Sequence, residues 1–145
     1  MDPSDQLLAG QGHHQVIDAL DEAGRIVELA AFGTERRYFV PGDAPCVFEV
    51  AGANGQQVKV GLLICEDAWF PAAARDAAAA GAQLLAVISA SPFHLGKVTE
   101  REERMALRAR DVGMPLLYAH LTGGQDEVVF DGASFALDAQ GHLGV

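Results

Sequence analysis

The stretch GLLICEDAWFP, residues 61–71, places one thiol and two carboxylates directly after a run of apolar residues. Cys65 ends a predicted buried strand, and a helix-prone segment begins within about six residues. A thiol on such a strand-to-helix turn is exposed at the carboxyl end of a sheet, near the amide of Glu66 as an oxyanion donor and near a helix N-terminus that favours the thiolate. Cys65 is therefore a candidate nucleophile for acyl transfer. The alternative, a small buried hydrophobic residue, stays open.

The two acids after Cys65 have two interpretations. Glu66 and Asp67 are typical of the first turn of a helix. A carboxylate at this place could also face the ammonium group of a substrate. The spacing alone does not decide between the two.

The elements that position Cys65 follow from apolar runs and turn residues. Runs at residues 58–65, 82–89 and 115–121 predict neighbouring buried strands. Because helical patterns separate them, the fold class is α/β, with crossover helices on one face of the sheet and hairpins at an edge. Hairpins are predicted for residues 14–20 with 25–32 around Asp21–Gly24 and for 46–50 with 58–65. Two further strands are predicted around Asp131–Gly132, with a turn after Asp138.

Two helices are predicted between these strands. One begins at Pro71 and is closed by Gly81 in the C′ position. The other begins at Thr99, whose hydroxyl can cap the amide of Glu102, and ends before Gly113. Its arginines alternate with acids, which predicts a solvated face with mixed pairing; they are Arg101, Arg104, Arg108 and Arg110.

Composition limits the class of protein. Half of the 145 residues are apolar and 21% are charged, which predicts a single soluble domain with its own core. A formal charge of −10 argues against nucleic acid as a partner. No run approaches the roughly 18 apolar residues of a membrane span, and the first residues lack a signal-peptide layout, so a cytoplasmic protein is expected. Its thiols should be reduced, with Cys46 in an apolar strand. No histidine spacing matches a zinc site, and residues 123–126, GGQD, are interpreted as a turn.

Three motifs carry a resemblance to a known family. LLICEDAW, ISASPFHLGKVTEREE and GGQDEVVFDGASF, in this order, closely resemble the glutaminase domain of glutamine-dependent NAD synthetase, in the carbon-nitrogen hydrolase or nitrilase superfamily. The resemblance implies part of an α-β-β-α sandwich. Residues 1–145 are then a single incomplete carbon-nitrogen hydrolase domain with a mobile tail over residues 1–15. The SGGxDS motif of the synthetase half is not found, so no synthetase domain is expected.

The resemblance also implies a site. In this family a Glu-Lys-Cys triad hydrolyses L-glutamine to glutamate and ammonia, without a cofactor. Cys65 would be the nucleophile, and Glu66 would supply an oxyanion amide and a contact to the substrate's amino group. Trp69, Ser91 and Phe93 would shape the pocket, and Lys97 is a further possible site residue.

The triad's glutamate and lysine motifs are not found in the sequence. Lys59 lies on the strand that ends at Cys65, roughly 20 Å away, and is excluded if that strand forms. His94 and His120 are candidate bases that are more often structural, and His120 stands where the family usually carries asparagine. Two functions remain: a glutaminase completed in a homo-oligomer or by another chain, and an inactive scaffold that acts by association.

Overall fold

The structure is a computed structural model that describes residues 18–20, 26–29, 44–53 and 55–144. It divides into two units, Met1–Gly42 and Asp43–Val145. In the first, strands β1 (Asp18–Leu20) and β2 (Ile26–Leu29) pair antiparallel, which confirms the hairpin predicted there. The predicted tail over residues 1–15 lies outside the described residues.

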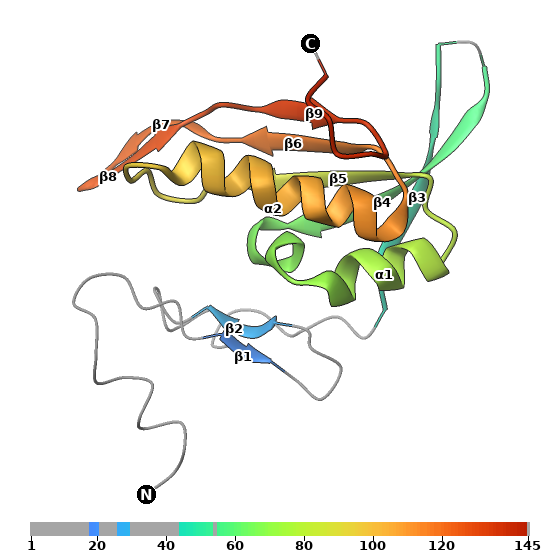
Figure 1. The fold of residues 1–145 in the computed structure, drawn as a ribbon, viewed down its shortest axis with the longest axis horizontal. Coiled ribbons are helices and arrows are strands. Elements are labelled where there is room, and N and C mark those ends of the chain that lie inside the picture. The colour runs from blue at the N-terminus through green and yellow to red at the C-terminus, as the bar shows by residue number, and fades with distance from the viewer. Residues whose placement is uncertain (1–17, 21–25, 30–43, 54, 145) are drawn as a thin grey trace, which may run out of the picture. The chain divides into compact units, whose positions relative to one another are not determined.

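The second unit is built on a five-stranded sheet ordered β3-β4-β5-β6-β9 (Figure 1). The strands are β3 (Cys46–Ala51), β4 (Gln57–Ile64), β5 (Leu84–Ser89), β6 (Leu116–His120) and β9 (Phe135–Leu137). The central strands β4, β5 and β6 are parallel, whereas β3 and β9 run antiparallel at the two edges. The predicted parallel arrangement of the three central strands is confirmed, and their carboxyl ends meet at one end of the sheet.

Both helices of this unit lie on the same side of the sheet (Figure 1). Helix α1 (Pro71–Ala79) begins at its proline, and Gly81 follows with a φ of 89°, as predicted. Helix α2 (Lys97–Val112) begins two residues before the predicted Thr99, so the predicted cap is wrong. The reason is Gly96, whose φ of 83° turns the chain into the helix and whose carbonyl accepts the amide of Glu100 at 3.1 Å.

The core lies between the helices and this face of the sheet. Side chains of alternating strand residues and of both helices fill it; the large or fully buried ones include Leu63, Leu85, Val87, Met105, Leu116 and Tyr118. Gly61 of β4 lies under α1, where an added Cβ would come 2.8 Å from the Cβ of Ala77. The small residues of α1 therefore let the helix approach the strand closely.

The predicted solvated arginine face of α2 is wrong for two of its four members. Arg101 and Arg108 are buried, with 1% and 6% of their surfaces exposed, whereas Arg104 and Arg110 are exposed. The buried pair faces carboxylates: Arg101 contacts Asp131, and Arg108 lies 3.2 Å from Asp111. Charge alternation along the sequence could not show which arginines face the sheet.

The opposite face of the sheet is apolar and exposed. Ile64 and Ile88 are paired in register and are 58% and 47% exposed. Side chains two residues apart in a strand share a face, so β6 adds Leu117 to the same surface. Leu121, the residue directly after β6, continues this alternation, and both leucines are exposed. We call this surface, made of Ile64, Ile88, Leu117 and Leu121, the open face.

A hairpin follows the sheet's central strands. Strand β7 (Thr122–Gln125) pairs antiparallel with β8 (Val128–Asp131). The sequence placed a turn over residues 123–126, but Gly123 to Gln125 lie in β7 and only Asp126 belongs to the turn. The two strands predicted on either side of Asp131–Gly132 are confirmed as β8 and β9.

Candidate functional site

Cys65 lies where the sheet's second strand turns into a helix. Strand β4 ends at Ile64, and a short 3-10 helix, η3 (Cys65–Trp69), begins at the cysteine itself. The backbone at Cys65 has a φ of 47°, which is uncommon for a residue other than glycine and marks a sharp turn. The thiol is partly exposed, and the hydroxyl of Ser89 on the neighbouring strand donates to its sulfur at 3.4 Å.

The acid two residues after Cys65 belongs to this turn. The Asp67 carboxylate accepts the amide of Ile64 at 2.9 Å, so it closes the start of η3. Burial raises the pKa of Asp67, against the opposing effect of this hydrogen bond. Of the two interpretations of the acids, the helix-start role holds for Asp67. Glu66 is half-buried in η3, and its oxyanion and substrate roles stay predictions.

Trp69 and Lys97 come together beside η3. The Lys97 ammonium lies 3.8 Å from the centre of the Trp69 ring, which is a cation–π contact, and 3.3 Å from Glu100. Its side chain is only 13% exposed. Lys97 is therefore held at the start of α2 by an aromatic ring and a carboxylate. A part for Lys97 in the site stays a prediction.

Ser91 and Phe93 follow β5, at the same end of the sheet as Cys65. The amide of Ser91 donates to Nε2 of His120 at 3.1 Å. The amide of Phe93 donates to the carbonyl of Val129 on β8 at 2.9 Å, and the Phe93 ring is 44% exposed. The segment is thus tied to β6 and β8, and it leaves an aromatic ring open to a ligand.

A buried polar cluster behind this segment was missed from the sequence. The Arg101 guanidinium donates to the Asp131 carboxylate and to the carbonyl of Gly132 at 3.4 Å. His120 lies beside them, with Nδ1 3.7 Å from Asp131. Arg101 and Asp131 are 30 residues apart, and only the fold of α2 against β8 brings them together. The signal in the sequence was Asp131, which lies in the motif GGQDEVVFDGASF.

The other residues that the sequence analysis considered, Lys59, His94 and Cys46, do not contact Cys65 in the described structure. Lys59 lies near the start of β4, at the far end from Cys65, as predicted. The His94 ring is exposed and lies 3.8 Å from Glu100. Cys46 lies in β3, so the strand predicted there is confirmed, and its thiol is exposed because β3 is an edge strand. Both thiols are free.

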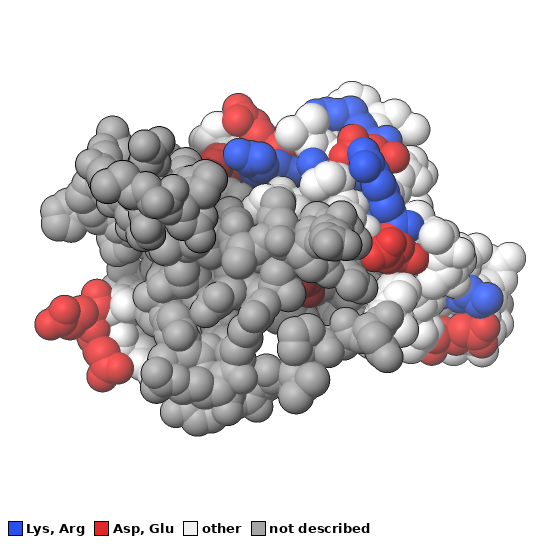
Figure 2. All heavy atoms as spheres, turned by 90° about the horizontal axis from the view of Figure 1, so that it is seen from below, with Lys and Arg blue, Asp and Glu red and all other residues white. Residues whose placement is uncertain are grey.

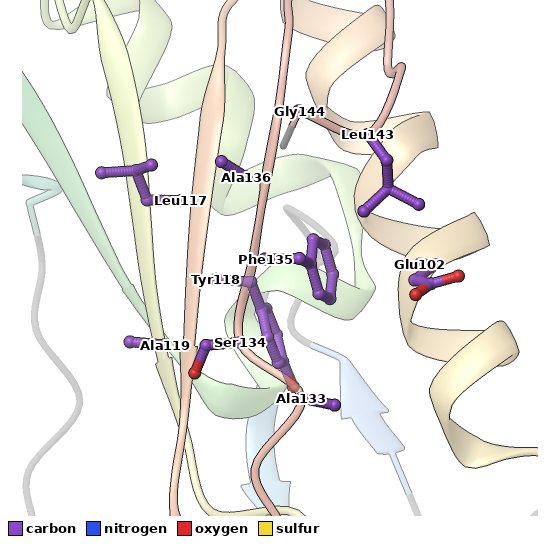
Figure 3. A pocket seen from close by; sticks show the side chains of 10 residues that line it. All are labelled: Glu102, Leu117, Tyr118, Ala119, Ala133, Ser134, Phe135, Ala136, Leu143 and Gly144. Atoms are coloured by element: carbon purple, nitrogen blue, oxygen red, sulfur yellow. The ribbon is translucent and has the colours of Figure 1, made fainter.

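A hollow of about 580 Å³ lies along the outer strand β9 (Figure 3). Its walls come from β6, β9 and α2, and the rings of Tyr118 and Phe135 stack there with centres 4.9 Å apart. Cys65 does not line it. The hollow therefore belongs to the sheet edge and has no part in the chemistry at the thiol.

The described residues contain no cluster of three or more side chains suited to a metal ion. Within the same ranges, no helix is long and apolar enough to cross a membrane. Lys and Arg side chains alternate with Asp and Glu over the described part of one face (Figure 2). This mixture offers no continuous basic surface there of the kind that binds nucleic acid.

Comparison with known proteins decides the family. A model of the carbon-nitrogen hydrolase family matches residues 27–144. The chain belongs to the carbon-nitrogen hydrolase family. Within that family it is similar to glutamine-dependent NAD(+) synthetases, with 45% identity over 111 residues to the Xylella fastidiosa enzyme and 39% over 123 residues to the Thermotoga maritima enzyme. These stretches cover 75% and 82% of this chain, and 19% and 20% of the two relatives.

Solved structures agree with the fold. This carbon-nitrogen hydrolase chain superposes on glutamine-dependent NAD+ synthetase from Acinetobacter baumannii with a TM-score of 0.68 and 32% identity, over 77% of this chain and 20% of that one. It superposes on a nitrilase-superfamily amidase from Nesterenkonia with a TM-score of 0.64 and 33% identity, over 77% of this chain and 40% of the amidase. The predicted nitrilase-type α/β fold is confirmed. The chain spans about a fifth of the length of the curated synthetases it matches.

Proposed function

We propose that this chain is the nucleophile-bearing part of a glutamine amidohydrolase. The observation that supports it most is the placement of Cys65 on a sharp strand-to-helix turn with the Ser89 hydroxyl on its sulfur. Family membership and similarity to glutamine-dependent synthetases support glutamine as the substrate. The amidase structure with a similar fold supports amide hydrolysis as the reaction class.

The chemistry begins with attack of the Cys65 thiolate on the side-chain amide carbon of glutamine. The carbonyl oxygen becomes an oxyanion, and we assign the amide of Glu66 as the donor to it. The nitrogen takes a proton and leaves as ammonia, which gives a thioester between Cys65 and the glutamyl group. Water then attacks the thioester, releasing glutamate and restoring the thiol.

This sequence of steps needs a base for the thiol proton and an acid for the leaving nitrogen. The motifs that carry the family's glutamate and lysine are not found in this sequence, and the side chain seen to hydrogen-bond to the sulfur of Cys65 is the Ser89 hydroxyl, which is not a base at neutral pH. We therefore propose that a complementing polypeptide supplies both groups. A cytoplasmic setting, where thiols stay reduced, is part of the proposal.

The open face supports such a partner. Its apolar side chains lie side by side on three neighbouring strands, and surfaces of this kind are usually covered by another protein. The Nesterenkonia amidase, which has a similar fold, is more than twice as long as the matched part, because the match covers 40% of it. A chain that carries the remaining part of such a domain is the occupant that fits. Self-association of this chain is the competing outcome, and light scattering after gel filtration separates the two.

The test of function is labelling of Cys65 with a diazoketone analogue of glutamine, followed by mass spectrometry. Such a probe needs the pocket and the thiolate, but not turnover. We expect labelling at Cys65 that free glutamine suppresses, no labelling of Cys46, and no ammonia release from glutamine by the chain alone. Equal labelling of both thiols, unaffected by glutamine, would support the inactive scaffold instead.

A further inference from the structure

His120 is a buried histidine with a defined acceptor role. Its side chain is completely shielded from solvent at the carboxyl end of β6. Its Nε2 atom lies 3.1 Å from the amide of Ser91, and an amide can only donate. Nε2 must therefore carry a lone pair, and in the neutral ring the proton then resides on Nδ1. We assign this tautomer from the hydrogen bond.

The other ring nitrogen faces a fixed carboxylate. Nδ1 lies 3.7 Å from Oδ1 of Asp131, and among the described residues neither atom has a hydrogen-bond partner. The second oxygen of Asp131 accepts from Arg101, which also donates to the carbonyls of Gly132 and Lys97. Arg101 is 1% exposed, so it holds Asp131 in one place between α2 and β8. The side of His120 that carries the proton thus faces negative charge.

The segment that His120 holds begins two residues after the contact to the nucleophile. Ser89 is paired in register with His120, its carbonyl accepts the amide of Leu121 at 2.9 Å, and its hydroxyl donates to Cys65. Ser91 follows after one residue. A displacement of the Ser91 amide would therefore also move the backbone next to Ser89, whose hydroxyl contacts the Cys65 thiol.

We infer that His120 is a positioning residue: through Nε2 it fixes the backbone of Ser91, and so the segment that carries Phe93, beside Cys65. Arg101 and Asp131 orient its ring. The role of this segment as a wall of the substrate pocket rests on the proposed function, whereas the hydrogen bond between Ser91 and His120 does not. The ring holds the Ser91 amide only while it is neutral, because a protonated Nε2 would point a hydrogen at the Ser91 amide hydrogen.

The charged and titratable groups around the His120 ring shift its pKa in opposite directions. Burial, and then the positive charge of Arg101 on α2, lowers the pKa of His120, and Asp131 at the end of β8 opposes this. The Tyr118 ring on β6 stacks beside it with centres 5.9 Å apart, and Cys65 lies beyond Ser89. The hold on Ser91 is therefore complete above the ordinary histidine pKa of about 6.5 and is lost as the pH falls through the lower value of the folded protein.

The first test needs no substitution. Long-range proton–nitrogen spectra of the 15N-labelled full chain report which ring nitrogen of each histidine carries the proton. We expect His120 to be the Nδ1–H tautomer, and we expect the Ser91 amide resonance to shift at low pH with the same midpoint as His120. The exposed His142, paired with Asp138 at 3.1 Å, is the internal control for the tautomer measurement, and its substitution by glutamine should leave the Ser91 resonance unchanged. An Nε2–H tautomer at His120, or a Ser91 amide that ignores its titration, would overturn the inference.

Substitutions test the acceptor itself. In His120→Gln the side-chain oxygen reaches the position of Nε2 and does not titrate, so hydrogen exchange at the Ser91 amide should stay slow at every pH. In His120→Leu the acceptor is lost, and that exchange should accelerate by roughly tenfold or more. Equal exchange in the two variants contradicts the inference. If His120→Leu does not fold, the comparison of His120→Gln with the unsubstituted chain across pH decides.

A third measurement links the segment to the site. Below the midpoint at which the Ser91 amide shifts, the rate of Cys65 labelling by the glutamine-like diazoketone should be several-fold higher in His120→Gln than in the unsubstituted chain, and the rates should converge well above that midpoint. Equal rates at both pH values contradict the link to the site. Absence of any labelling of Cys65 counts against the proposed function and leaves the tautomer and Ser91 results standing, so the two failures are distinguishable.

Discussion

The Ser89 hydroxyl donates to the Cys65 sulfur at 3.4 Å, across the pair of parallel strands β4 and β5. A hydroxyl that donates to sulfur stabilises negative charge there, and hydrogen bonds to charged groups contribute about 1.5–3 kcal/mol. Ser89 is therefore the described side chain that supports the nucleophile most directly. It is buried, which keeps its hydroxyl directed at the thiol and away from water.

Replacement of Ser89 by alanine should slow alkylation of Cys65 at neutral pH by roughly tenfold, because the thiolate loses this hydrogen bond. The measurement is the rate of iodoacetamide labelling by mass spectrometry, site by site. Cys46, exposed on the edge strand, is the matched control within the same molecule and should keep its rate. An unchanged rate at Cys65 would mean that the Ser89 contact has no effect on the thiol.

Removal of the carboxylate of Asp131 should destabilise the fold strongly. In Asp131→Asn the buried Arg101 guanidinium keeps its charge and loses its anionic partner, which typically costs about 3–5 kcal/mol. Arg110→Met on the same helix removes an exposed guanidinium and should change the free energy of unfolding by less than about 0.5 kcal/mol. Urea unfolding of the two variants gives the comparison, and similar values would contradict the importance of the buried pair.

The stability of the chain should fall in two steps as the pH decreases. His120 has a lowered pKa, so its contribution is present above about 6.5 and is lost below it. The hydrogen bond from Arg101 lowers the pKa of Asp131 below its usual 3.8, so that contribution is present above this value and is lost as the pH falls through the lower one.

Urea unfolding between pH 3 and pH 8 measures these steps. His120→Gln should remove the upper one, and Asp131→Asn should reduce the lower one. The lower step will not vanish, because hydrogen bonds from the His142 backbone lower the pKa of Asp138 as well, while burial of Asp67 acts in the opposite sense. If the upper step in stability persists in His120→Gln, a group other than His120 causes it.

The contact of Lys97 with Trp69 can be read from fluorescence, because Trp69 is the one tryptophan of the sequence. Lys97→Met should change the emission spectrum and lower the free energy of unfolding by roughly 1 kcal/mol, since a cation 3.8 Å above the ring is lost. The other lysine, Lys59 on β4, is the matched control. If Lys59→Met changes the emission as much, the cation–π contact is not the cause.

Close packing of α1 on β4 should make Gly61 intolerant of a methyl group. In Gly61→Ala the new Cβ would meet the Cβ atoms of Ala77 and Ala82 at 2.8 Å and 3.1 Å, an overpacking that costs roughly 1–3 kcal/mol. Gly124→Ala, where the nearest atom would be at an ordinary 3.5 Å, is the control for a glycine in a strand. Equal thermal stability of the two variants would show that α1 adjusts freely.

The sequence predicted the strand and helix order and the place of Cys65, because those features depend on local periodicity and turn residues. Pro71 and Gly81 bound α1 by backbone preferences that act within a few residues. Gly96 was overlooked as a helix start because a capping box at Thr99 also fitted the local pattern. Local rules therefore gave the type of element correctly and its boundary less well.

Burial was the property that the sequence could not give. Arg101 was predicted to be a solvated residue of a charged helix, and only Asp131, the last residue of β8, provides the carboxylate that permits its burial. Cys46 reads as an interior strand residue, but β3 is an edge strand. For Arg101, a residue distant in the sequence allows burial. For Cys46, the lack of a further strand beside β3 leaves the residue exposed.

The open face also makes association of the chain sensitive to ionic strength. Copies with a formal charge of −10 repel one another over about 8–10 Å at physiological salt, and added salt shortens that range. In dilute buffer this repulsion keeps the exposed isoleucines and leucines of different copies apart, while a partner of opposite charge is drawn in. In concentrated salt the repulsion is screened, and apolar contact between identical copies becomes more favourable. The salt content of the buffer thus selects which association is observed.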